Sequence, residues 1–267
     1  MSETTRIRLG HEGATARLTL ARPDVRNAFD EAMIAEVTGA LGELARSVQA
    51  EPDRAPRALI VTGEGAAFCA GADMNWMRRS VTFTREENEA DAGRFAAMLR
   101  ALDELPIPTM ARVNGACLGG GMGLISCCDV VVAAESADFG FTEVRLGIAP
   151  AVISTFVLPR IGASAARRYF LTGEIFKAAE AKAIGLVHEV APLDALDAAV
   201  GRLVEAIAGN GPRAVAAAKN LIREGLSLRR DEAIQNSIQA IAGLRASPEG
   251  QEGLGAFLEK RRPAWKR

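Results

Sequence analysis

Two segments rich in small residues constrain what this chain can fold into. One spans residues 68–73 (Phe-Cys-Ala-Gly-Ala-Asp) and the other spans residues 114–121 (Asn-Gly-Ala-Cys-Leu-Gly-Gly-Gly). Each follows an apolar run typical of a buried strand, residues 58–62 before the first and residues 110–113 before the second. Each also leads toward a helical pattern. Two strand ends can therefore present free backbone N–H groups to one cleft.

Paired N–H donors of this kind stabilise an oxyanion, such as the enolate of a thioester. Gly120, expected at the start of a helix, adds the positive end of the helix dipole. The tight strand-to-helix turns of many α/β proteins have the same local sequence character. The two segments by themselves therefore leave an oxyanion site and a purely structural turn both open.

The composition limits the classes of partner. The chain has 267 residues, of which 49% are hydrophobic, enough for one globular domain with a subdomain. A net charge of −1 gives no bulk attraction to nucleic acid or to a membrane. No segment resembles a signal peptide and no apolar run reaches spanning length. We expect a soluble, cytoplasmic protein that binds neither nucleic acid nor a membrane.

The cysteines and histidines do not form a metal-binding pattern. There are four cysteines, none in a Cys-x-x-Cys pair, and two histidines, His11 and His188. A structural zinc site is therefore not expected. Buried thiols in a reducing compartment explain the cysteines better than a redox role. They are Cys69, Cys117, Cys127 and Cys128.

The N-terminal half alternates strands and helices. Residues 7–9 and 14–20 predict a hairpin, and Asp30 is placed to cap a helix. The apolar positions of that helix are Met33, Val37, Leu41, Leu44 and Val48. Residues 74–84 are mixed in character, with Trp76 expected to be exposed, and we interpret them as a mobile loop beside the site.

The second half becomes increasingly helical. A helix with Phe95, Met98, Leu99, Leu102 and Leu105 on one side precedes short strands at residues 130–133 and 138–140. Beyond residue 195, apolar stripes at helical spacing dominate. The expected fold is an α/β core over residues 1–195, with the groove and active site, and a helical subdomain over residues 196–267.

The ordered set of motifs resembles the enoyl-CoA hydratase/isomerase (crotonase) superfamily over nearly the whole chain. The motifs lie at residues 22–28, 68–73, 119–121, 139–150, 166–173, 183–187 and 257–263. The resemblance implies a spiral of ββα units and a helical C-terminal region through which the chain trimerises. It also implies a homotrimer or a dimer of trimers, an acyl-CoA thioester as substrate, and no cofactor beyond the coenzyme A of the substrate itself.

The resemblance assigns residues to the site. Ala72 and Gly120 would supply the two N–H groups of the oxyanion hole, and Glu143 would transfer the proton. Coenzyme A would contact Arg26, Ala28, Ala70, Asp73 and Met74, with Phe257 and Lys260 reaching it from a neighbouring subunit. Lys260 is equally well explained as a solvated lysine beside two arginines.

Glu143 also has a local argument. It stands among Phe139, Phe141, Val144 and Leu146, and partial desolvation by such neighbours raises the pKa of a carboxyl and suits it to proton transfer near neutral pH. A solvent-facing glutamate, or one paired with Arg145, is the alternative that the local sequence leaves open.

One departure from the resemblance bears on the reaction. Two-carboxylate hydratases of this superfamily carry a second glutamate where this chain has Gly123, and no carboxylate occurs between Gly115 and Asp129. Either Glu143 serves both proton transfers through one water, or another group assists. A single glutamate also suits a double-bond isomerase, and a catalytically silent thioester-binding protein remains a third reading. A nicotinamide enzyme is disfavoured, since the Gly-x-Gly-x-x-Gly pattern is broken by Leu124.

The finest resemblance is to the 3-methylglutaconyl-CoA hydratase branch of leucine breakdown. It rests on residues 75–77, 121–124 and 142–154. The leading expectation is therefore a hydratase acting on 3-methylglutaconyl-CoA or a related branched enoyl-CoA. Arg78, Arg79 and Arg145 are candidates to pair with a substrate carboxylate, or ordinary surface charges. Specificity is expected to lie in residues 74–84 and 150–157.

Overall fold

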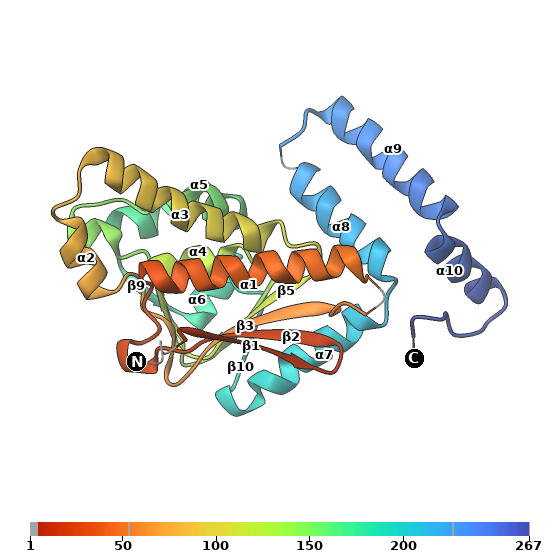
Figure 1. Cartoon of the computed structure of the whole chain (residues 1–267), viewed down its shortest axis with the longest axis horizontal. Helices are drawn as coiled ribbons and strands as arrows, with labels where there is room; N and C mark the ends of the chain where they lie inside the picture. Colours follow the sequence, from red (N-terminus) through yellow and green to blue (C-terminus); the bar gives the residue numbers. More distant parts are fainter. Residues whose placement is uncertain (1–4, 53, 226, 267) are drawn as a thin grey trace.

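The computed structural model describes residues 5–52, 54–225 and 227–266, whose strands form a six-stranded and a four-stranded sheet (Figure 1). The larger sheet has the order β1-β2-β3-β5-β7-β10 and the smaller the order β4-β6-β8-β9. The larger comprises β1 (Ile7–Glu12), β2 (Thr15–Leu20), β3 (Ala58–Gly63), β5 (Thr109–Val113), β7 (Val130–Ala134) and β10 (Glu189–Ala191). The smaller comprises β4 (Ala67–Cys69), β6 (Ala116–Leu118), β8 (Asp138–Gly140) and β9 (Ile175–Lys177).

A repeated strand–strand–helix unit builds both sheets. In the runs β3-β4-α2, β5-β6-α4 and β7-β8-α5, the first strand joins the larger sheet and the second joins the smaller one. The helices are α2 (Met74–Ser80), α4 (Gly120–Ser126) and α5 (Ala151–Thr172). The expected ββα spiral is confirmed. The sequence prediction missed the short strands β4 and β6, which form the early part of the two glycine segments.

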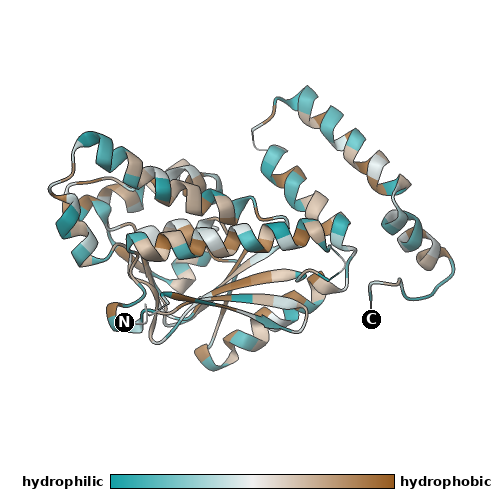
Figure 2. Ribbon diagram, viewed as in Figure 1, coloured by the Kyte–Doolittle hydropathy of each residue, from teal (hydrophilic) through white to brown (hydrophobic). Residues whose placement is uncertain are grey.

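The central strands of the larger sheet, β3, β5 and β7, are buried on both faces. Leu59 and Val61 of β3 face the main core with helix α1 (Glu31–Ala50), whereas Ala58 and Ile60 face a second cluster with helix α7 (Leu196–Ala208). Figure 1 shows α1 and α7 on opposite sides of the strands, and Figure 2 shows the hydrophobic colour of the strands between them. Burial on both faces explains why residues 58–62 form an unbroken apolar run.

The N-terminal predictions are confirmed in detail. β1 and β2 pair as an antiparallel hairpin, with Glu12 opposite Thr15 beside the turn. The carboxylate of Asp30 caps α1 by accepting a hydrogen bond from the Met33 N–H at 2.8 Å. Helix α3 (Arg85–Asp103) buries Met98, Leu99 and Leu102 as expected. Further short elements are η1 (Pro23–Val25), η2 (Glu143–Leu146), α6 (Ala178–Ala183) and η3 (Leu193–Ala195).

The interpretation of residues 74–84 as a loop was wrong for residues 74–80, whereas residues 81–84 lie outside any helix or strand. Residues 74–80 form helix α2, because the Asp73 carboxylate accepts hydrogen bonds from the N–H groups of Asn75 at 2.7 Å and Trp76 at 3.4 Å. An N-cap of this kind satisfies amide groups that a helix cannot satisfy itself. Trp76 is half-buried, not exposed. The segment beside the site therefore has a defined conformation.

The C-terminal third is helical, as predicted. The stripe Leu196, Val200, Leu203 and Ile207 packs α7 onto the larger sheet. The next three helices extend beyond the sheets, on the right in Figure 1. They are α8 (Pro212–Gly225), α9 (Arg230–Ala246) and α10 (Pro248–Leu258). The division at residues 195 and 196 stays an expectation, although α7 belongs with the core by its packing.

The cysteine prediction is confirmed, since all four thiols are free and buried. Burial raises the pKa of Cys69 and of Cys128 to about 12, so these thiols stay protonated.

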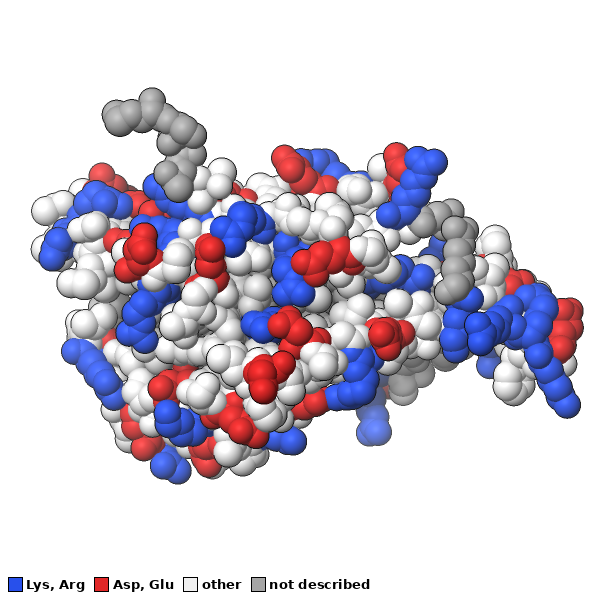
Figure 3. Space-filling view, turned by 90° about the horizontal axis from the view of Figure 1, so that it is seen from below, with Lys and Arg blue, Asp and Glu red and all other residues white. Residues whose placement is uncertain are grey.

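In the described part of the chain, no helix is both long and apolar enough to cross a membrane. On the face seen in Figure 3, acidic and basic side chains are interspersed. The expected cytoplasmic location stays a prediction.

Candidate active site

The two glycine segments meet, as their positions in neighbouring strands predict. β4 pairs with β6 in parallel, so residues 70–72 and 119–120 leave the smaller sheet at the same edge. Gly71 has φ 94° and Gly119 has φ 51°, conformations that side-chain-bearing residues rarely adopt. A β-carbon added to Gly71 would lie 3.3 Å from the Leu118 carbonyl oxygen and 3.8 Å from the Gly120 nitrogen. Glycine at these positions lets the two backbones approach closely.

Two backbone N–H groups remain free where the segments meet. The N–H of Phe29 donates to the Gly71 carbonyl and the N–H of Asp73 donates to the Phe29 carbonyl, both at 2.8 Å. The N–H of Ala72, between them, donates to no acceptor within the described residues. Gly120 is the first residue of α4, where an N–H has no partner inside the helix. Both groups border one cavity and are available to an oxygen bound there.

Glu143 lies beside these donors. It begins η2 directly after β8, and β8 pairs with β6, which brings the carboxylate against Gly119. A β-carbon added to Gly119 would lie 3.6 Å from Glu143 Oε1. Glu143 Oε2 is buried and has no hydrogen-bond partner in the described part of the chain. Burial raises the pKa of this carboxyl above its usual range, opposed only in part by a hydrogen bond from its own backbone.

The neighbours that bury Glu143 differ in part from those expected. Phe139 and Phe141 are fully buried beneath it, but Leu146 is 62% exposed and does not cover the carboxylate. No ion pair joins Glu143 to Arg145 among the described residues, so the alternative of a paired surface glutamate is not what the structure shows. A buried oxygen without a partner costs free energy in the unliganded protein. Such a group is typical of a site that completes its hydrogen bonds with a ligand.

A cavity of about 290 Å³ joins these groups. Ala72, Gly120 and Glu143 line it together, which brings the three predicted catalytic residues to one place. Glu143 carries the only charge in the lining, within the described residues. The remaining lining residues are Phe29, Trp76, Ala92, Phe95, Ala149, Pro150, Ala151, Val152 and Ile153. The cavity thus combines an apolar wall with two N–H donors and one carboxyl group.

The place of a second glutamate is filled by the core. A β-carbon added to Gly123 would lie 2.4 Å from Ile153 Cγ2 and 3.2 Å from Leu99 Cδ1. Side chains in a packed core cannot approach this closely without movement. Ile153 lines the cavity from α5, so an apolar side chain occupies the space beside Gly123. The glycine and the isoleucine are a matched pair.

The five residues expected to contact coenzyme A flank Phe29 and Ala72 in sequence, but none of them lines the cavity, and their exposures differ. Met74 is 66% exposed and Arg26, in a left-handed conformation, is also exposed. Ala70 is half-buried and Ala28 is buried. Asp73 is 4% exposed, with its carboxylate engaged by the α2 cap and by Arg22 Nη2 at 2.8 Å. The Asp73 side chain therefore faces the protein, which leaves its backbone for any contact with a ligand.

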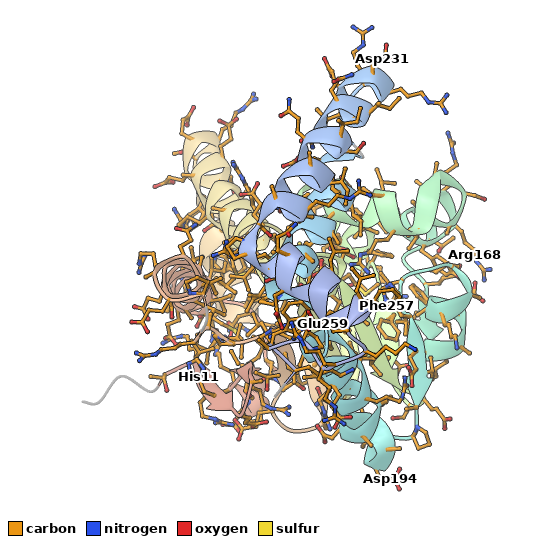
Figure 4. The ribbon with its side chains drawn as sticks, turned by 90° about the vertical axis from the view of Figure 1, so that its right-hand side faces the viewer. His11, Arg168, Asp194, Asp231, Phe257 and Glu259 are labelled. Atoms are coloured by element: carbon orange, nitrogen blue, oxygen red, sulfur yellow. The ribbon has the colours of Figure 1, made fainter. Side chains whose placement is uncertain are left out.

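Phe257 and Lys260 do not join the site within one chain. Both lie at the end of α10, at the opposite end of the molecule from α2 (Figure 1). Phe257 is 80% exposed and, as Figure 4 shows, lies on the outer face of the C-terminal helices. Their assignment to coenzyme A stays a prediction that requires a neighbouring subunit.

The three candidate arginines do not line the cavity. Arg79 pairs with Glu31 at 2.5 Å, and Arg78 donates to the Asn75 side chain at 3.0 Å. Arg145 packs beside Gly173, since a β-carbon there would lie 3.4 Å from Arg145 Nε. Their description as surface charges is the one that the structure favours.

Sequence reasoning placed residues 74–84 and 150–157 beside the substrate but missed Phe95 as part of the cavity wall. Phe95 was assigned only to the core, although its ring packs edge-on against Phe29 at 5.5 Å and both rings line the cavity. Trp76 and Ile153 lie in the two segments expected to set specificity, and both line the cavity, although Trp76 was expected to be exposed. A residue on an apolar helix stripe carries no local sign that its tip reaches a cavity. Only contacts between distant helices reveal it.

Comparison with known proteins gives a consistent picture. A model of the enoyl-CoA hydratase/isomerase family matches residues 10–267. A crotonyl-CoA hydratase of Syntrophomonas wolfei is 34% identical, with 96% of each chain covered. A 2,3-dehydroadipyl-CoA hydratase of Escherichia coli is 34% identical, covering 93% of this chain and 94% of the relative. The crystal structure of an enoyl-CoA hydratase from Shewanella pealeana superimposes with a TM-score of 0.91 at 39% identity, covering 98% and 97% of the two chains.

Proposed function

Because this chain belongs to the enoyl-CoA hydratase/isomerase family, we propose that it adds water across the double bond of an α,β-unsaturated acyl-CoA. The observation that carries the proposal is the convergence of Ala72, Gly120 and the unpartnered carboxyl of Glu143 on one cavity. The resemblance to crotonases implied these three residues before the structure did. A thioester bound in this cavity can contact all three residues at once.

The proposed reaction uses the free amide groups first. The thioester oxygen accepts hydrogen bonds from the N–H groups of Ala72 and Gly120, which draws electron density from the double bond and makes the β-carbon electrophilic. Glu143 takes a proton from water, and the hydroxide adds to that carbon. The resulting enolate is stabilised by the same two donors and by the positive end of α4. The α-carbon then takes up a proton, and no resident metal or redox cofactor has a step in this scheme.

Glu143 also supplies the second proton transfer in this proposal. With Ile153 opposite, no other carboxyl among the described residues reaches the cavity lining. The proton taken from water can return to the α-carbon from the same carboxyl once the enolate has formed. A raised pKa makes Glu143 a better acid for this step than an ordinary glutamate.

An enoyl-CoA isomerase is the second candidate function, and one observation favours it. A single carboxyl that removes and returns one proton is sufficient for moving a double bond, and the apolar Ile153 side of the cavity excludes a second acid. Incubation with paired 2-enoyl and 3-enoyl thioesters separates the two. Hydration adds the mass of one water and removes the conjugated absorbance of the 2-enoyl thioester, whereas isomerisation of a 3-enoyl thioester leaves the mass unchanged and creates that absorbance.

The same panel tests whether the chain is a silent binder. A ligand that binds only the folded state stabilises it and so raises the melting temperature. At a ligand concentration about one hundred times Kd, the free energy of unfolding increases by about 2.7 kcal/mol. A thermal shift without turnover of any thioester would support the silent-binder reading. The absence of any shift at saturating acyl-CoA would contradict thioester binding itself.

The finer proposal is an acyl group with a polar end, as in 3-methylglutaconyl-CoA or a related branched thioester. Its support is the indole N–H of Trp76, which is buried without a hydrogen-bond partner in the described part of the chain, on a side chain that lines the cavity. The first turn of α5 lies at the same cavity and has neither an acidic residue nor a side-chain cap. Its positive end favours an anion. Together these groups can receive an acyl carboxylate without an arginine.

We expect Trp76→Phe to change the choice between substrates. The substitution keeps an aromatic ring in the cavity wall but removes the indole donor. A hydrogen bond to a charged acceptor contributes about 1.5–3 kcal/mol, so the ratio of kcat/KM for 3-methylglutaconyl-CoA over 3-methylcrotonyl-CoA should fall about 10- to 100-fold. An unchanged ratio would contradict the proposed polar end. Phe95→Leu is the matched control, because it alters the apolar wall without removing a donor.

Self-association is part of the proposal, with a homotrimer or a dimer of trimers as the assembly. Helix α9 exposes Ile234, Ile238 and Ile241 in one row, and Ile238 is 52% exposed in the isolated chain. On α10, the apolar side chains of Leu254, Phe257 and Leu258 are also exposed. Exposed apolar surface of this kind is typical of contacts between proteins.

We expect sedimentation at micromolar concentration to give a trimer or hexamer mass. A double substitution, Ile234→Lys with Ile238→Lys, should shift the species toward a monomer, since burying two charges in an apolar contact is unfavourable. Arg230→Glu on the same helix is the control for a change of charge alone. A stable monomer of the parent chain would contradict the proposed assembly.

A further inference from the structure

A network of polar contacts behind the Ala72 amide has no part in the chemistry described above. Residues 70–73 run beside residues 26–29 and are joined to them by backbone hydrogen bonds. The N–H of Ala70 donates to the Arg26 carbonyl at 3.0 Å. The backbone of Phe29 is hydrogen-bonded to Gly71 and to Asp73, the residues on either side of Ala72. The N–H of Ala72 takes no part in these hydrogen bonds with residues 26–29, so it stays available to a ligand.

Arg22 ties this support together. Its side chain is 19% exposed, and its Nη2 donates to Asp73 Oδ2 at 2.8 Å, while its Nη1 donates to the Ala28 carbonyl at 2.5 Å. Nη2 also lies 3.3 Å from Asp30 Oδ2, the carboxylate that caps α1. One guanidinium thus joins the caps of α1 and α2 to the segment, residues 26–29, that supports residues 70–73. The planar fork of arginine suits such a junction, and a lysine cannot reproduce it.

The Asp73 carboxylate is the other half of the network. Its side chain is only 5% exposed, and both oxygens accept hydrogen bonds within the protein. Oδ2 accepts from Arg22, and Oδ1 accepts from the first amide groups of α2. Burial alone would raise the pKa of this carboxyl. The hydrogen bonds from the Asn75 amide and from Arg22 outweigh it and lower the pKa, so the carboxylate is charged in the folded protein. A charged, buried group with fixed partners holds the backbone next to it in one position.

We propose that Arg22 is a positioning residue for the oxyanion hole, acting through Asp73 to aim the N–H of Ala72 at the thioester oxygen. The inference rests on the proposed function, since it assumes that a thioester oxygen lies between Ala72 and Gly120. Donors of this kind act only when they are already in place as charge develops. A misplacement of about 1 Å can cost on the order of 100-fold in rate.

The test compares Arg22→Met with the parent. Methionine keeps an apolar stem and removes the guanidinium. We expect kcat to fall about 10- to 100-fold, with KM changing less than about threefold. The substitution disturbs the orientation of the Ala72 N–H but removes no contact with the bound thioester. Arg8→Met is the matched control. Arg8 forms an exposed ion pair with Glu64 at 2.9 Å in the same part of the chain, and it does not touch residues 70–73. Its kcat should equal that of the parent.

A spectroscopic measurement separates aiming from general destabilisation. The carbonyl stretch of a saturated acyl-CoA labelled with ¹³C at the thioester carbon moves to lower frequency when its oxygen accepts hydrogen bonds. This shift should be smaller in Arg22→Met than in the parent and unchanged in Arg8→Met. Arg22→Lys, which keeps the charge, should give intermediate values. If Arg22→Met fails to fold, Asp73→Asn, which keeps the α2 cap and loses the charge, should show the same fall in kcat and in the shift.

The outcomes distinguish this inference from the proposed function. A parent chain that binds and converts enoyl thioesters, together with an Arg22→Met variant of parental kcat and parental carbonyl shift, would overturn the inference alone. A parent chain that shows no carbonyl shift with any acyl-CoA would overturn both. A reduced shift with a reduced kcat supports the positioning role.

Discussion

Glu143→Gln is expected to lower kcat by about 100- to 10,000-fold, the usual contribution of a general acid or base. Glutamine keeps the size of the side chain and can still donate or accept a hydrogen bond, but it cannot take a proton from water at neutral pH. The cavity lining has no other charged side chain among the described residues, so little residual activity should remain. Turnover and binding are measured separately, by product absorbance and by thermal shift with an acyl-CoA.

Binding should survive this substitution. Glu143 Oε2 has no partner among the described residues, and the side-chain oxygen of glutamine can still accept the hydrogen bond from its own backbone, so the substitution should leave the fold intact. The pH profile supplies a second readout. Because burial raises the pKa of Glu143, the acid limb of kcat/KM in the parent should lie above the usual glutamate value of about 4.3 and rise with pH as the carboxyl ionises. A Gln variant within about threefold of the parent would contradict the mechanism.

Gly120→Pro is expected to lower kcat by about 100- to 1,000-fold, the effect of removing one donor from an oxyanion hole. Proline has no backbone N–H, and it is well tolerated at the first position of a helix, which is where Gly120 stands in α4. The substitution therefore removes the donor while leaving a residue suited to the helix. Single-turnover rates with a saturating enoyl thioester report the chemical step directly.

Gly120→Ala is the control, because it keeps the N–H. A β-carbon at this position would lie 3.1 Å from Phe95 Cζ and 3.4 Å from Phe29 Cδ2, so alanine and proline share the cost of that close contact. The comparison between the two variants separates the effect of replacing the amide hydrogen by the proline Cδ from the effect of the added β-carbon. Equal rates for the proline and alanine variants would mean that the Gly120 amide does not stabilise the developing charge.

The local parts of the fold were predictable because they depend on neighbours in sequence. The cap of α1 by Asp30 and the stripe from Met33 to Leu44 follow from the turn of one helix, and the hairpin of β1 and β2 follows from alternation around one turn. Helix α2 was missed because its seven residues include no buried stripe. Its cap, Asp73, was assigned to the ligand instead. A single aspartate before a short segment serves either role equally well in sequence.

The site was predictable only through resemblance, for a different reason. Ala72 and Gly120 act through backbone amides, which every residue except proline has, so residue type alone does not identify them. The apolar neighbours of Glu143 in sequence predicted partial desolvation but left a solvent-facing glutamate open, and Leu146, one of those neighbours, is exposed. What brings the three together is the parallel pairing of β4 with β6 and of β6 with β8. Such pairing between strands distant in sequence cannot be predicted from the sequence of either strand alone.

The sequence by itself determined the repeating strands and helices, the close approach allowed by Gly71 and Gly119, and the absence of a carboxyl at position 123. These are properties of side-chain size, polarity and spacing along one chain. The tertiary structure alone decided that Ile153 fills the space beside Gly123, that Asp73 turns inward to Arg22, and that Trp76 lines the cavity. Each of these depends on which distant segments pack against one another, because close packing allows one atom, and not two, to occupy a given place.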